Sequence, residues 1–122
     1  MANPVVHFEI IGKDTKALQD FYTKLFGWNI DANNSMNYGL ARTKTNDRGI
    51  DGGISAGDPS QPDQSYVTIY AEVDDPDAYL KKVENLGGKI IVPTTEIPNM
   101  VTFAMFADPE GHMVGLVKAE SM

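Results

Sequence analysis

Residues 5–11 (VVHFEII) combine the apolar and polar side chains of a strand whose two faces meet different surroundings. Because side chains alternate between the faces of a strand, Val6, Phe8 and Ile10 share one face. His7 and Glu9 share the other. The first face predicts contact with a hydrophobic core. The second raises the question of what an imidazole and a carboxylate approach.

Two segments have the apolar spacing of amphipathic helices. The first follows Asp14 and Thr15, which are both N-cap candidates, and stops at Gly27. Its apolar stripe consists of Ala17, Leu18, Phe21, Tyr22 and Leu25. The second follows Asp75 and stops at Gly87–Gly88. Its inward side chains are expected to be Tyr79, Leu80, Val83 and Leu86.

The other apolar segments have the length and alternation of strands. They are residues 36–42, 50–56, 65–73, 89–94, 100–107 and 112–118. Residues 57–65 (GDPSQPDQS) contain two prolines and no apolar side chain, which predicts a linker. A single domain of residues 1–122 is therefore expected, with a first module at 1–57, a linker at 58–65 and a second module at 66–122.

The second half of the chain repeats the first at a shift of 61 residues, which pairs Asp14 with Asp75. Residues 49–54 (GIDGGI) match residues 111–116 (GHMVGL) at a shift of 62. Strand, helix cap, helix, glycine stop and last strand recur in the same order. The chain is thus predicted to consist of two copies of one β-α-β-β-β unit, in the α+β class.

Composition narrows the possible functions. The chain has 122 residues, 42% of them hydrophobic, and a net charge of −7, which disfavours binding to nucleic acid or to an anionic membrane. No apolar run approaches the roughly 20 residues of a membrane span, and no secretory signal is visible. Without cysteine there is neither a disulfide framework nor a thiolate metal site. A cytoplasmic location is expected.

Two segments resemble a known family. HFEIIGKDTKALQDFYTKLFGW resembles the opening of the vicinal-oxygen-chelate superfamily, which includes glyoxalase I, extradiol dioxygenases and the bleomycin- and fosfomycin-resistance proteins. FADPEGHMVGL resembles the closing turn and last strand of that family. The resemblance implies two tandem modules that form a cupped, half-open barrel, with helices on the convex side and a ligand cavity on the concave side. It also implies a homodimer.

The same resemblance implies four positions for metal ligands, in the first and last strands of each module. They correspond here to His7, Gly53, Thr68 and Gly115. Of these four, only His7 has a side chain of the usual ligand type, and a catalytic site generally needs about three protein ligands. No metal or other cofactor is therefore expected. A divalent ion held by His7, Glu9 and improvised partners is the alternative.

The candidate ligand-binding residues are His7, Glu9, Thr68 and Tyr70, with Trp28, Tyr38, Phe103 and Met105 as possible cavity walls. Structural interpretations compete with each of these. Trp28 can cover the edge of the core, and Met105 can belong to the core. His7 and Glu9 can form a satisfied pair, or they can act as a general base or as an anchor for a hydrogen-bonding or cationic ligand.

Three functions are compatible with these residues. The first is a small-molecule-binding protein that works without a catalytic metal, as the resistance proteins do. The second is a glyoxalase-like lyase or isomerase, or a dioxygenase-related enzyme, that uses His7 and Glu9 as candidate catalytic groups and in one version an atypical metal site. The third is an interaction domain whose cavity is vestigial.

Overall fold

The computed structural model describes residues 2–34, 37–57 and 64–119. The chain divides into two compact units. One comprises residues 7–67, and the other combines the first six residues with residues 68–122. Among the described residues, no helix has both the length and the apolar composition of a membrane span.

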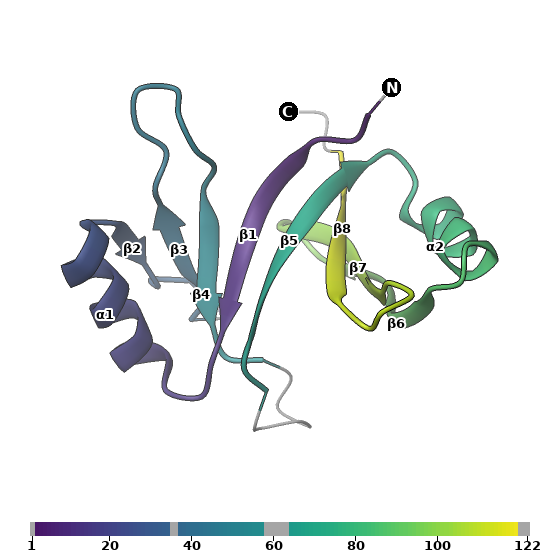
Figure 1. The fold of residues 1–122 in the computed structure, drawn as a ribbon. Coiled ribbons are helices and arrows are strands. Elements are labelled where there is room, and N and C mark those ends of the chain that lie inside the picture. The colour runs from purple at the N-terminus through teal and green to yellow at the C-terminus, as the bar shows by residue number, and fades with distance from the viewer. Residues whose placement is uncertain (1, 35–36, 58–63, 120–122) are drawn as a thin grey trace. The chain divides into compact units, whose positions relative to one another are not determined.

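The described residues of the unit 7–67 form one helix and a sheet with the strand order β2-β3-β4-β1 (Figure 1). Its elements are β1 (Val5–Ile11), which begins in the other unit, α1 (Thr15–Phe26), β2 (Asn29–Asp31), β3 (Gly39–Arg42) and β4 (Gly52–Ser55). β1 pairs with β4 in parallel, and the other pairs are antiparallel. At the start of α1 the Asp14 carboxylate accepts a hydrogen bond from the Ala17 amide at 3.1 Å. Gly27 ends the helix in the left-handed conformation, with φ of 71°.

The other unit repeats this arrangement with the strand order β5-β8-β7-β6. Its elements are β5 (Tyr66–Val73), which begins in the first unit, α2 (Pro76–Asn85), β6 (Lys89–Ile97), β7 (Val101–Ala107) and β8 (Met113–Lys118). β5 and β8 are parallel. The Asp75 carboxylate caps α2 by accepting from the Ala78 amide at 3.4 Å. The core beneath α2 consists of Val73, Leu80, Ala104 and Leu116.

Aromatic side chains of β1, α1 and the residues after it pack together in the first unit. The Trp28 ring lies 5.5 Å from Phe8 of β1 and 5.4 Å from Tyr22 of α1, measured between ring centroids. Phe8 lies directly over Gly52, where an added Cβ would collide with its ring. The apolar face of β1 thus packs under the helix, as its alternation predicts.

The α+β class and the two β-α-β-β-β modules are confirmed. In the register of the parallel pairs, Glu9 is opposite Gly53 and Tyr70 is opposite Gly115, so the repeat brings corresponding residues to corresponding places. β6 runs on to Ile97 through Pro93, which an edge strand tolerates.

Some predicted details differ from the structure. The pattern did not locate β2, because Asn29–Asp31 contains a single apolar residue. Leu86 was expected to point inward, but it lies beyond the last turn of α2 and is 78% exposed. Position 36, the start of one predicted strand, and most of the predicted linker (58–63) lie outside the described residues.

Candidate functional site

Three polar side chains of the first unit form a hydrogen-bonded chain. The Tyr38 hydroxyl donates to Glu9 Oε2 at 2.8 Å, and His7 Nε2 lies 2.8 Å from the same hydroxyl oxygen. The His7 and Tyr38 rings are nearly parallel, with 20° between their planes. All three side chains are half-buried. The polar face of β1 therefore meets a tyrosine that comes from the segment before β3.

The backbone around Tyr38 is fixed by one asparagine. The Asn34 side chain accepts a hydrogen bond from the Tyr38 amide at 3.0 Å and donates to the Tyr38 carbonyl at 2.7 Å. Asn37, just before Tyr38, has φ of 54°, a conformation that asparagine tolerates better than most residues. The phenol ring of Tyr38 lies across Gly53 of β4, where an added Cβ would collide with the far end of the ring.

The direction of the hydrogen bond from Tyr38 to Glu9 implies the tautomer of His7. Tyr38 has one hydroxyl proton and gives it to the carboxylate, so its oxygen must accept the other hydrogen bond. The Nε2 atom of His7 therefore carries a proton. Burial lowers the pKa of the His7 imidazole, and the negative charge of Asp51 opposes this by raising it. Because its pKa is lowered, His7 is a neutral imidazole at neutral pH.

The corresponding face of the second unit is buried and uses its polar groups internally. The Thr68 hydroxyl donates to the Met113 carbonyl at 2.6 Å, and the Tyr70 hydroxyl points at Met105 Sδ at 3.9 Å. Tyr70 lies over Gly115, with which it is in register. Phe103 is half-buried and lies two residues from Met105 on β7. The structure thus brings Tyr70 and Met105 together around Gly115.

Trp28 lies on the helix-facing side of the first unit, against Phe8, Tyr22 and Phe26. This position agrees with the interpretation in which Trp28 covers the edge of the core. Tyr38, predicted as a possible cavity wall, joins His7 to Glu9. Finding that role from the sequence would require the path of the loop before β3, which no pattern of apolar residues encodes.

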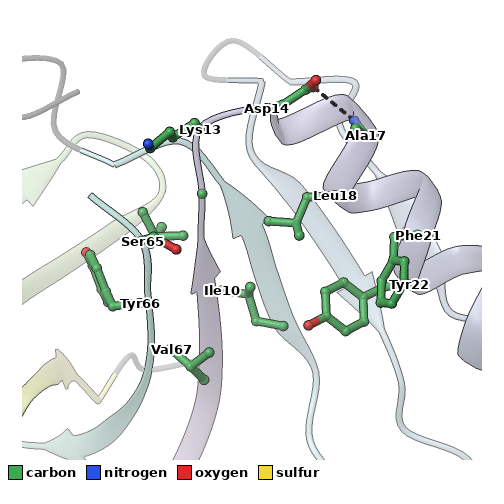
Figure 2. Close-up of a pocket in the computed structure, with 12 residues that line it drawn as sticks. Ile10, Lys13, Asp14, Ala17, Leu18, Phe21, Tyr22, Ser65, Tyr66 and Val67 are labelled. Carbon is green, nitrogen blue, oxygen red and sulfur yellow. Dashed lines mark hydrogen bonds between the residues drawn. The ribbon is translucent and has the colours of Figure 1, made fainter. Parts of the chain in front are cut away.

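A depression of the first unit lies apart from this chain of hydrogen bonds. It is an open hollow of about 760 Å³ between the start of α1, the end of β1 and residues 65–67. Figure 2 shows Ile10, Leu18 and Tyr22 on one side of it and Val67 on the other. Apolar side chains dominate the hollow. The candidate site residues His7 and Glu9 do not line it.

The residues present do not fit the family's four-ligand metal site. Gly53 and Gly115 have no side chain, and tyrosine rings lie where one would start. The Thr68 hydroxyl is bonded to a backbone carbonyl. In the part of the chain that the structure describes, no three His, Cys, Asp or Glu side chains gather as a metal-binding group.

Comparison with known proteins identifies the family. Residues 5–116 match the model of the Glyoxalase/Bleomycin resistance protein/Dioxygenase superfamily, and the chain belongs to this superfamily. It is 30% identical over 117 residues to the anthracycline biosynthesis protein DnrV of Streptomyces peucetius, covering 85% of this chain and 42% of that protein. It is 32% identical over 110 residues to the putative glyoxylase CFP32 of Mycobacterium bovis, covering 87% of this chain and 42% of that one.

The fold is also found in solved structures. A variant of methylmalonyl-CoA epimerase from Streptomyces coelicolor superposes with a TM-score of 0.61 at 15% identity, over 100% of this chain and 98% of that one. At this identity the likeness concerns the fold alone. The chain spans about two fifths of the length of the curated relatives that it matches.

Proposed function

We propose that the protein binds a small molecule at the face formed by His7, Tyr38 and Glu9, and that it does so without a catalytic metal. The observation that carries this proposal is the hydrogen-bonded chain itself, with its two 2.8 Å contacts. A half-buried carboxylate and imidazole held in one orientation by a phenol are typical of a preorganised polar group in a ligand site. The walls predicted from the second module, Thr68, Tyr70, Phe103 and Met105, remain predictions.

The charge of these three side chains limits the class of ligand that complements them. With a neutral imidazole, the three side chains carry the single negative charge of Glu9, so a ligand with a cationic group or several hydrogen-bond donors complements them. The net charge of −7 acts in the same direction at longer range. An organic cation or a polyhydroxylated metabolite is therefore the proposed ligand.

A thermal-shift screen with organic cations and small oxygenated metabolites, in buffer containing EDTA, tests the proposal. A ligand at about 100 times its Kd should add roughly 2.7 kcal/mol of stability. The Glu9→Gln variant should lose most of this shift, whereas Glu110→Gln, on an exposed turn, should retain it. Hits that stabilise both variants equally would place the ligand elsewhere and contradict the proposal.

Acid–base catalysis on the same face is the second candidate, and the proton-bearing chain favours it. When His7 takes up a proton, its Nε2 proton can pass to the Tyr38 oxygen while the Tyr38 hydroxyl proton passes to Glu9. One proton thus enters the three side chains, and Glu9 holds it. An epimerase among the structural neighbours and a putative glyoxylase among the relatives support a reaction at a carbon next to a carbonyl. Deuterium incorporation at that carbon in D₂O, followed by NMR and lost in His7→Gln, tests this candidate.

The expected homodimer belongs to the same proposal. Phe21 and Leu25 of α1 are each 56% exposed and Val67 is 69% exposed, all in the first unit. The curated relatives have room in one chain for a second domain of this size. A second copy of the chain is therefore the proposed cover for these side chains. Light scattering should give twice the monomer mass, and Phe21→Glu should lower the measured mass toward that of the monomer. A monomer at all concentrations would contradict it.

A further inference from the structure

We propose that Arg42 is a specificity-determining residue of the first module, and that the bound small molecule carries a carboxylate in addition to its cationic or hydroxyl groups. The inference rests on the proposed function, because it concerns the ligand held at His7, Tyr38 and Glu9. It adds to that site a second anchor of opposite charge to Glu9. One ligand thus meets hydrogen-bond acceptors at one end and a guanidinium at the other.

The register of the first sheet separates its two sides. One row of residues in register across β1, β4, β3 and β2 is apolar and consists of Phe8, Gly52, Ala41 and Ile30. The Phe8 ring packs against Trp28, which itself packs on α1, so this row faces the helix. Because side chains alternate along each strand, the rows before and after it lie on the side of the sheet away from α1.

Both of these rows contain charged residues. One row in register is Glu9, Gly53, Leu40 and Asp31. Extending the register by one residue in the other direction gives the row His7, Asp51, Arg42 and Asn29, in which Arg42 is paired with Asn29. The ion pair between Arg42 Nη1 and Asp51 Oδ2, at 3.8 Å, supports this alignment. Arg42 therefore lies on the same side of the sheet as His7 and Glu9.

Arg42 lies two strands away from His7, on β3, with Asp51 between them. Neighbouring strands are about 4.8 Å apart, so the two backbones are separated by roughly 10 Å. The negative charge of Asp51 raises the pKa of His7, against the effect of burial, which agrees with Asp51 lying beside the imidazole. A small molecule bound at His7 and Glu9 therefore reaches Arg42 when its acidic group lies at the far end of the molecule.

Arg42 can exchange its present contact for a ligand at little cost. Its side chain is 61% exposed, and its 3.8 Å contact with Asp51 is longer than a hydrogen bond. Asp51 does not depend on that contact, because its Oδ1 atom accepts hydrogen bonds from the amides of Thr43 and Lys44 at 2.9 and 3.0 Å. The ion pair thus keeps the guanidinium near the site while leaving its N–H groups able to donate to a ligand.

The charges of the two polar rows select the kind of anion. Arg42 is the one positively charged residue in them, beside Glu9, Asp51 and Asp31. A guanidinium binds a carboxylate through two parallel hydrogen bonds, and the single charges balance. A phosphate group, with about two negative charges, would be repelled by the neighbouring carboxylates more strongly than one arginine offsets. A carboxylate is therefore the acidic group that matches this surface.

Calorimetric titration with acid and amide pairs tests the inference. The probes are carnitine with carnitinamide, for a cationic ligand, and gluconate with gluconamide, for a polyhydroxylated one. Within each pair only the carboxylate is replaced, by a neutral group of nearly the same shape. The wild type is expected to bind the acid of the pair that fits about tenfold more tightly than its amide, the scale of one charged hydrogen bond.

Three variants assign this preference to Arg42. Arg42→Gln should bind acid and amide equally, at the affinity of the wild type for the amide. Arg42→Lys should keep part of the preference, because it retains the charge but loses the two parallel hydrogen bonds. Arg48→Gln is the matched control, since Arg48 is also exposed and lies at the turn of the same hairpin, bridged to Thr45. It should retain the full preference.

Two results would overturn the inference and leave the proposed function standing. One is equal binding of an acid and its amide by the wild type. The other is a preference for the acid that persists in Arg42→Gln, which would show that the arginine only neutralises Asp51. Absence of binding by all four probes would instead contradict the proposed function, and the role of Arg42 with it.

Discussion

The two modules share their topology and register but use the same strand face differently. In the first, His7 and Glu9 on β1 are half-buried and bonded through Tyr38. In the second, the repeat-related Thr68 and Tyr70 on β5 are buried, at 4% and 8% exposure. A repeat thus preserves the backbone pairing while one copy holds titratable groups and the other is filled with packed side chains.

The helices differ in the same sense. α2 buries Pro76 and Leu80 against its sheet, whereas no residue of α1 is fully buried. Leu80 belongs to a compact core with Val73 and Leu116. The difference indicates that α2 contributes more packing energy to its module than α1 does.

Shortening one leucine side chain in each helix should give the largest difference between the two modules. Leu80→Ala removes a 4%-exposed side chain from the second core and should lower the free energy of unfolding by about 2–5 kcal/mol. Leu18→Ala, at a half-buried position lining the hollow under α1, should cost clearly less, because the site is already open. Urea unfolding followed by circular dichroism measures both. Equal losses would show that the modules are equally packed.

The two glycine–tyrosine pairs give the next largest effect. Gly115→Ala would press on the ring atoms nearest the backbone of buried Tyr70, so a loss of about 1–3 kcal/mol from overpacking is expected. Gly53→Ala would meet only the far end of Tyr38, which can swing away at a lower cost. Thermal unfolding of both variants tests this order. A greater loss in Gly53→Ala would mean that Tyr38 is held as firmly as Tyr70.

Equal effects are expected where the modules are alike. Asp14 and Asp75 cap their helices through the same amide, three residues on, so replacing either with alanine should cost about 1 kcal/mol. Replacement by asparagine, which retains the cap oxygen, should cost less. Urea unfolding of the four variants provides the measurement. A cap that matters in only one module would show that the other helix is held by packing alone.

Local signals in the sequence sufficed for much of the fold. Asp14, Gly27 and Asp75 act at the predicted ends because capping and left-handed stops depend on a few neighbouring residues. The repeat also paired Gly53 with Gly115 correctly. β2 was missed because three residues with one apolar side chain contain too little alternation to be detected.

The candidate site was only half predictable for a similar reason. Alternation places His7 and Glu9 on one face of β1, but it does not say what approaches them. Tyr38 reaches them because Asn34 holds its backbone and Gly53 leaves room for its ring. The first condition links residues four apart and the second links residues of different segments, and neither leaves a periodic signal. Trp28 follows the glycine that ends α1, so the helical period does not predict which face of the unit its side chain lies on.

The pH dependence of stability should show the smallest difference between the modules, and it tests the polar face itself. Because burial lowers the pKa of folded His7, the unfolded chain takes up a proton first as the pH falls through about 6.5. The free energy of unfolding therefore falls in this range and levels off below the folded pKa. His7→Gln should lose this contribution, while Thr68→Val in the second module should keep it.

Because Asp51 opposes the shift, Asp51→Asn should lower the pKa of His7 further, as NMR titration of the ring proton would show. A His7 that titrates above its ordinary value would mean that the imidazolium is the form bound to Tyr38, and the charge on this face would then be zero rather than −1.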